Sequence, residues 1–185
     1  MANDPRIVLE TLEHAFADNA MPAVPVDCDD GRATIVLLMD PASELPDRMP
    51  RQTPSGRWTL RTLSEADRDR LYRQWLASHA LVTVKEAFAV APALRAVTLV
   101  VLRRDTNPFG EPIVEPLYVG TFARERFERL DFAREDVLDA LFYADEVRVR
   151  AKGKARRLER LDLRDEPELA ALVDRVRTAL ARGEA

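Results

Sequence analysis

Residues 64–91 read SEADRDRLYRQWLASHALVTVKEAFAVA and predict the longest element of the chain. Ser64 is a favourable N-cap residue, Asp67 gives an acidic variant of the capping box, and the next proline is Pro92, so the stretch is typical of one uninterrupted helix. At 1.5 Å per residue, this helix is about 40 Å long. Its first half is charged and its second half is mostly apolar, so we expect the second half to be the central buried helix. The apolar residues in question are Trp75, Leu76, Leu81, Val82, Val84, Phe88 and Val90.

The sequence on either side of this helix predicts a mixed sheet and two terminal helices. Apolar residues recur at helical spacing at both ends of the chain, whereas alternating or continuous apolar runs lie between them. We therefore expect an α/β (α+β) fold, in which a mixed β-sheet is crossed by the long helix and flanked by amphipathic N- and C-terminal helices. The expected helices are 5–18, 64–91, 124–130, 136–143 and 165–182, and the expected strands are 24–28, 33–39, 57–63, 97–102, 117–121 and two within 146–163.

Two segments between these elements have a distinct composition. Residues 40–56 contain four prolines, which remove amide donors, so we expect a loop there and no regular element. Residues 146–163 alternate apolar and basic side chains on either side of Lys152-Gly153-Lys154, which predicts a basic β-hairpin. A chain of 185 residues lies within the usual size range of one domain, so we expect residues 1–185 to form a single domain.

Composition limits the classes of protein to which this chain can belong. A hydrophobic share of 46% and a charged share of 32% are ordinary for a folded protein. Cys28 is the only cysteine, residues 1–5 lack the pattern of a signal peptide, and no apolar run is long enough to cross a bilayer comfortably. We therefore expect a cytoplasmic protein without a membrane segment. The net charge of −4 argues against a surface built as a whole for nucleic acid, but it allows a local basic patch.

The usual catalytic and cofactor motifs are missing. Cys28, His14 and His79 are too few and too scattered to predict a zinc site. The six glycines form neither a dinucleotide fingerprint nor a phosphate-binding loop, and no serine lies in a nucleophile elbow. We therefore expect no cofactor.

The order of predicted elements resembles the core of restriction-endonuclease-like nucleases, but the chemistry of that class is not present. Strands 33–39 and 57–63 contain no carboxylate and no lysine, although a metal-dependent nuclease of this class needs both. Two clusters of carboxylates could bind the metal ion instead. One lies around the turn at 29–31 and the other around the loop 105–112. They are Asp27, Asp29 and Asp30, and Asp105, Glu111 and Glu115. The simpler interpretation of both groups is a solvated turn or loop.

The strongest charge signal belongs to the predicted basic hairpin. Seven cations and two carboxylates give it a net charge of +5, which is attractive to a phosphate backbone. The cations are Arg148, Arg150, Lys152, Lys154, Arg156, Arg157 and Arg160, and the carboxylates are Glu146 and Glu159. No aromatic side chain is interleaved to stack on bases, and a hairpin that is merely solvated is the competing interpretation.

Parts of the chain resemble an uncharacterised domain family found in hypothetical proteins of actinobacteria and similar high-GC bacteria. The resemblance rests on Leu71-Tyr72, on residues 84–92 (VKEAFAVAP), on residues 116–120 (PLYVG) and on residues 165–169 (DEPEL). These residues belong mainly to the expected core and helix caps. The family has no assigned activity, so the resemblance implies no site residue.

Because every specific catalytic pattern is missing while the scaffold signals agree, we expect a non-catalytic interaction module. Its expected partner is another protein or a second copy of the chain, with weak, sequence-independent contact to nucleic acid or another polyanion through the basic hairpin. The alternative is a diverged metal-dependent nuclease-like enzyme that binds its metal ion through one of the two clusters of carboxylates.

Overall fold

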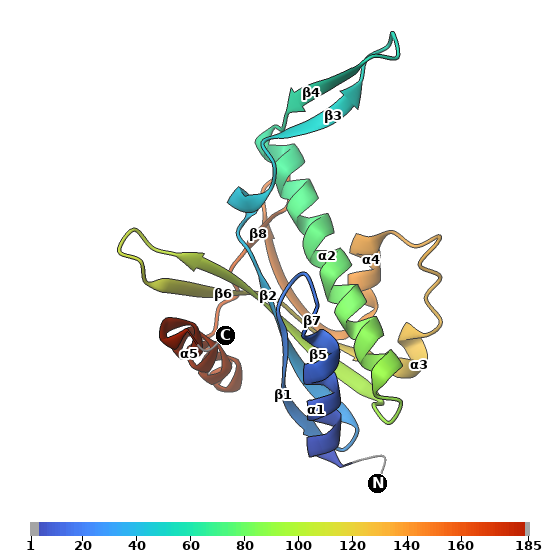
Figure 1. Cartoon of the computed structure of the whole chain (residues 1–185), viewed down its shortest axis with the longest axis vertical. Helices are drawn as coiled ribbons and strands as arrows, with labels where there is room; N and C mark the ends of the chain where they lie inside the picture. Colours follow the sequence, from blue (N-terminus) through green and yellow to red (C-terminus); the bar gives the residue numbers. More distant parts are fainter. Residues whose placement is uncertain (1–3, 184–185) are drawn as a thin grey trace.

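A mixed six-stranded sheet forms the centre of the computed structural model, which describes residues 4–183 (Figure 1). The strand order is β1-β2-β5-β6-β7-β8, and every neighbouring pair is antiparallel except β2 and β5, which run parallel. The bounds are β1 Ala23–Asp29, β2 Arg32–Met39, β5 Ala96–Thr106, β6 Pro112–Ala123, β7 Asp145–Lys152 and β8 Arg157–Glu159. The expected α+β class with a mixed sheet is therefore confirmed.

The long helix α2, Glu65–Val90, makes the crossover that the parallel pair β2 and β5 requires. It begins as the sequence predicts, because the Ser64 hydroxyl accepts the amide of Asp67 at 3.2 Å. It ends at Ala91, immediately before Pro92. Helix α1, Pro5–Phe16, packs beside α2 on the same face of the sheet, and together they cover the first hydrophobic core.

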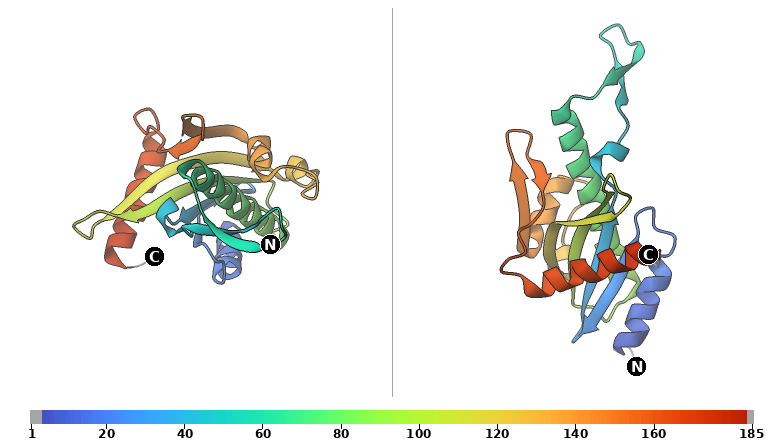
Figure 2. Two further views of the ribbon diagram at one scale, coloured as in Figure 1. Left: turned by 90° about the horizontal axis from the view of Figure 1, so that it is seen from above. Right: turned by 90° about the vertical axis from the view of Figure 1, so that its left-hand side faces the viewer.

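The opposite face of the sheet carries a second, smaller core under the C-terminal helix α5, Pro167–Arg182. Figure 2 shows the sheet lying between α5 and the pair α1 and α2. Since β2 and β5 are buried on both faces, they have continuous apolar runs, as the run 33–39 predicts. The buried residues of this second core are Val36, Leu38, Val100, Leu102, Val114, Val119, Leu161, Leu169, Leu172 and Val173.

The expectation for α2 needs one correction. Phe88 is buried and Trp75 is half-buried, but Val82 and Val90 are exposed. The helix lies against the sheet along one side only, so these two valines point away from the core.

The proline-rich segment 40–56 is not wholly a loop, which corrects a second expectation. After a short turn η1, Ala42–Glu44, residues Arg48–Gln52 form β3, which pairs with β4, Trp58–Thr62, in a separate two-stranded sheet. Proline is tolerated in β3 because a two-stranded ribbon has a free edge along each strand, where a missing amide costs no ladder bond.

The segment between β6 and β7 is mostly irregular. It contains the short helices α3, Arg124–Phe127, and α4, Val137–Ala140, followed by the 3-10 turn η2, Leu141–Tyr143. The two helices are shorter than the sequence predicts. They pack along α2, where the rings of Phe88 and Phe127 lie 5.6 Å apart.

Candidate functional site

The predicted basic hairpin forms as β7 and β8, and half of the six cations proposed as its binding residues are in ion pairs. Arg148 reaches Glu166 at the start of α5, with 2.5 Å between Nη1 and Oε2. Arg150 and Lys152 each lie 3.8 Å from Glu159 on the opposing strand. The alternative of a solvated, internally paired hairpin therefore describes this part of the strand.

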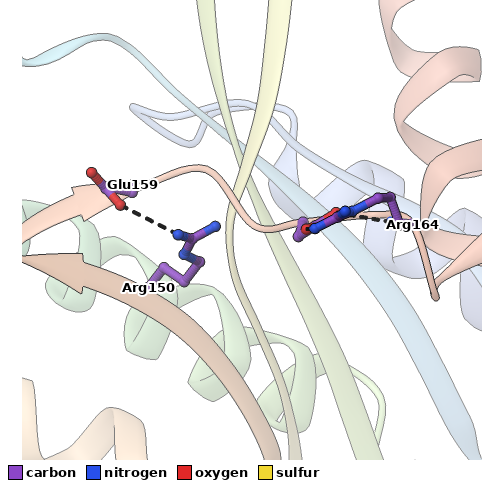
Figure 3. A network of polar contacts seen from close by, with 4 residues as sticks. Arg150, Glu159 and Arg164 are labelled. Carbon is purple, nitrogen blue, oxygen red and sulfur yellow. Dashed lines mark hydrogen bonds and ion pairs between the residues drawn. The ribbon is translucent and has the colours of Figure 1, made fainter.

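Figure 3 shows how the ion pairs continue beyond β8. In the picture Arg150 points to Glu159. Beyond β8, Arg164 forms an ion pair with Asp162, with 2.5 Å between Arg164 Nη2 and Asp162 Oδ2. Hydrogen bonds from Arg164, with a smaller contribution from the charge of Arg150, lower the pKa of Asp162 to about 2. This carboxylate therefore stays ionised at neutral pH, close to the hairpin cations.

The other three proposed cations, Lys154, Arg156 and Arg157, lie in and just after the turn of the hairpin. All three are exposed, and none forms an ion pair with another residue of the described range 4–183. The net charge that the hairpin offers to a polyanion is therefore concentrated at its tip.

A second basic element was not predicted. Strands β3 and β4 with their turn, residues 48–62, form a ribbon that we call the arm; it projects beyond the N-terminal end of α2 (Figure 1). All ten strand residues of the arm are exposed. The arm contains Arg48, Arg51, Arg57 and Arg61 and no aspartate or glutamate, so it carries a charge of +4.

The strand register gives the arm two different faces. Residues paired across an antiparallel ribbon point to the same side, and Arg61 is opposite Met49 while Arg51 is opposite Thr59. Alternation along the chain adds Arg57 to that side. We call Arg51, Arg57 and Arg61 the basic face.

The opposite side of the arm contains its exposed apolar residues, together with Arg48 at its base. Pro50 pairs with Leu60 and Gln52 pairs with Trp58, so these four residues share a face. Trp58 is 68% exposed and Leu60 is 67% exposed. Trp58 directly follows Arg57 in the chain but lies on the side opposite the basic face, so the arm presents arginines on one face and an exposed aromatic side chain on the other.

The arginines of the arm are largely free of protein partners. Within residues 4–183 the side chains of Arg48, Arg51 and Arg57 form no ion pair and no hydrogen bond. Arg61 is the exception, since its Nη2 lies 3.7 Å from Oδ2 of Asp67. Guanidinium groups without protein partners are available for an external anion.

The base of the arm is fixed to α2, although the arm itself is exposed. Arg68 in the first turns of α2 pairs with Asp47 at 2.6 Å, and it also donates to the carbonyl of Ala42 at 3.4 Å. The amide of Leu63 donates to the carbonyl of Asp47 at 2.9 Å. These contacts hold both ends of the arm together and set its direction from the body.

The carboxylates proposed for a metal do not converge. Asp30 pairs with Arg95 at 2.7 Å, and Glu115 pairs with Arg103 along the sheet. Glu111 accepts a hydrogen bond from Asn107 at 2.7 Å within its own loop. Across the part of the chain that the structure describes, no three side chains of His, Cys, Asp or Glu are placed to hold a metal ion. Asp27 and Asp29 lie on the edge strand β1 and Asp30 lies in the turn after it. Asp105 lies near the end of β5, Glu111 in the loop that follows, and Glu115 within β6.

One signal could have revealed the arm. Residues 57–62, RWTLRT, alternate as a strand should, whereas the prolines of residues 40–56 favour a loop. The run of four arginines without a carboxylate between residues 48 and 62 is a charge pattern that composition over the whole chain conceals.

No family model, curated protein or solved structure matches this chain. Among the helices of residues 4–183, none has the length and apolarity that crossing a bilayer requires.

Proposed function

We propose that this chain is a non-catalytic interaction module that binds nucleic acid through the basic face of the arm. The observation that carries the proposal is an exposed two-stranded ribbon whose arginines lack protein partners and whose sequence contains no carboxylate. Arginine on such a surface gains energy chiefly by neutralising phosphates and releasing their counterions.

The shape of the arm favours duplex nucleic acid. The major groove of B-DNA is wide enough to admit a two-stranded β-ribbon. In such a groove the basic face would contact the phosphates of one strand of the duplex. The outer edges of β3 and β4 can enter the groove because no other strand of the protein pairs with them. A ribbon held at its base by Arg68 and Asp47 needs little ordering on binding.

The β7–β8 hairpin supports the proposal as a second contact. The right-hand view of Figure 2 shows the β7–β8 hairpin beside α2, with its turn directed toward the end of the molecule from which the arm projects. The unpaired cations at the hairpin tip, Lys154, Arg156 and Arg157, are thus on the side from which the arm would approach a polyanion. Three of the six cations predicted from the sequence are used in ion pairs, so this hairpin contributes less than the arm.

The test is a fluorescence-anisotropy titration of labelled duplex DNA with the full chain at low salt. The variant R51S/R57S/R61S removes the basic face without touching the core, because the strand residues of the arm are exposed. We expect it to bind about tenfold more weakly or worse, since three phosphate contacts are lost.

The matched control is R6S/R134S/R177S, which removes the same charge from exposed positions outside the arm. It should bind like the native protein apart from a small general effect. The proposal would be contradicted if the arm variant bound duplex DNA with unchanged affinity, or if the control variant lost as much affinity as the arm variant.

Two further predictions belong to this function. The single cysteine and the composition favour a cytoplasmic protein, where nucleic acid is accessible. Binding of a protein partner or of a second copy of the chain stays a prediction. An arm that binds no nucleic acid at low salt would favour a protein surface as its partner. No observation favours the metal-dependent nuclease as a second function.

A further inference from the structure

A cavity of about 300 Å³ lies between α2, the segment from α4 to η2, and strands β6 to β8. Its lining is mostly apolar, with Leu76 from α2, Leu141 from η2 and Leu158 from β8. It is separate from the basic face of the arm, so a ligand there would not depend on the proposed nucleic-acid contact.

One polar atom in this lining lacks a partner. The Nε of Arg73 is fully buried and forms no hydrogen bond, and it is the only such side-chain atom found in residues 4–183. A buried N–H without an acceptor is unfavourable, and nearly all such groups in proteins are satisfied. A hydrogen-bond acceptor supplied by a ligand would satisfy this one.

The other charges of the cavity lie at its rim. Arg156 from the β7–β8 turn is exposed and has no ion pair within the described range. Asp136, directly before α4, and Asp139, on α4, are exposed as well. Asp136 is already engaged, since its Oδ1 accepts the amide of Leu138 at 2.7 Å. The rim thus has one cation and two carboxylates, and Arg73 in the lining brings the net charge of the four groups to zero. The unsatisfied demand for an acceptor comes from Nε of Arg73.

We propose that this cavity binds a small organic acid whose carboxylate meets the guanidinium of Arg73 and whose apolar body fills the remaining volume. A planar guanidinium presents a fork of donors that matches a carboxylate. The leucine lining supplies the apolar contacts that hold the body of such a ligand. The acid is recognised by the guanidinium of Arg73, whose Nε is buried and unpaired, and Arg156 at the rim adds attraction for the anion on entry.

The test uses the full chain and 3-phenylpropionate as the probe, with 3-phenylpropanol as the uncharged counterpart of nearly equal shape. In ¹H–¹⁵N correlation spectra, the acid should shift the amide signals of Leu76, Leu141 and Leu158 saturably at millimolar concentrations. The alcohol should bind about tenfold more weakly, because it cannot form the charge-assisted hydrogen bonds.

The variant Arg73→Gln should weaken binding of the acid by about tenfold and leave binding of the alcohol unchanged. Its matched control is Arg70→Gln, on the same helix, where Arg70 pairs with Asp67 and does not line the cavity. Absence of saturable shifts, equal binding of acid and alcohol, or an Arg73→Gln variant that binds the acid like the native protein would each overturn the proposal. The comparison of acid with alcohol needs no variant, so it holds even if Arg73→Gln folds poorly.

Discussion

The contact between Tyr118 and Gly120 shows how closely single residues are fitted in this fold. Both lie on β6 and point to the same face, and the Tyr118 hydroxyl donates to the carbonyl of Leu141 at 2.8 Å. A Cβ atom on Gly120 would lie 2.2 Å from the Tyr118 hydroxyl oxygen and 3.0 Å from Cβ of Ala144. The backbone of Gly120 has no positive φ, so this position needs glycine for space. The hydroxyl lies in a buried environment, which raises the pKa of Tyr118 well above its ordinary value.

Replacing Gly120 by Ala should therefore destabilise the protein by about 1 to 3 kcal/mol, as is typical when atoms are forced into a packed core. Urea denaturation measures the change. In the background of Tyr118→Phe, where the hydroxyl is gone, the same replacement should cost less, because the closest contact has been removed. Equal costs in the two backgrounds would show that the hydroxyl is not what excludes the methyl group.

At the scale of single elements, the sequence predicts the bounds of α2 well. It does not predict which side of the helix is exposed. Ser64 determines where the helix begins, because its hydroxyl accepts a hydrogen bond from an amide of the first turn. Pro92 determines where it ends, because proline has no amide to continue the helical hydrogen bonds. The side of the helix that is buried depends on where the sheet and the segment from α3 to η2 lie. Those positions are set by contacts distant in sequence, which is why the exposure of Val82 was not predictable from periodicity.

The central position of α2 can be tested at Phe88, which is 4% exposed and packs against Phe127 and the guanidinium of Arg124. Truncation of Phe88 to Ala should cost about 3 to 5 kcal/mol of unfolding free energy. Val82→Ala on the same helix is the control and should cost little, because Val82 is 57% exposed. Similar melting curves for native protein and Phe88→Ala would contradict the assignment of this helix to the core.

The arm is the element for which sequence and structure differ most. Alternation in residues 57–62 predicts β4, but its partner β3 contains Pro50, and prolines argue against a strand when the partner strands are unknown. The pairing of Pro50 with Leu60 is possible because no third strand needs its amide. The basic hairpin shows the opposite case: its strands were predicted, but the ion pairs of Arg148 with Glu166 and of Arg150 with Glu159 depend on the tertiary fold.

Because all ten strand residues of the arm are exposed, replacing residues 48–62 by a short Gly-Ser linker should leave the body folded. The melting temperature should change little, and duplex binding should be lost. Calorimetry and anisotropy measure the two effects separately. A large fall in melting temperature would mean that the arm stabilises the body, and retained binding would assign the contact to another surface.

At the scale of the whole molecule, charge is distributed very unevenly. The chain carries −4 and the arm +4, so the remaining residues together carry −8. The acidic remainder repels a phosphate backbone, whereas the basic arm attracts it, so under the proposed function the molecule would meet nucleic acid with the arm first. Net charge alone therefore gives a misleading picture of this protein, since it averages two regions of opposite sign.

The layered arrangement was largely predictable from the sequence, and the proposed binding surface was not. Continuous apolar runs such as 33–39 indicate strands covered on both faces, and the amphipathic ends indicate the two helices that cover them. A surface site leaves no such pattern, because exposed arginines obey no packing periodicity. Whether an exposed arginine is available for an external anion depends on which carboxylates lie near it, and those neighbours are known only in the folded chain.

The most direct test of the arm is the salt dependence of duplex binding. Each phosphate contact contributes about 0.9 to the slope of log affinity against log salt concentration on B-DNA. Removal of Arg51, Arg57 and Arg61 in R51S/R57S/R61S should therefore reduce the slope by about 2.7 relative to the native protein, if each arginine neutralises one phosphate. The slope of R6S/R134S/R177S should stay at the native value. A slope that is the same in native protein and arm variant would contradict the claim that the arm binds nucleic acid.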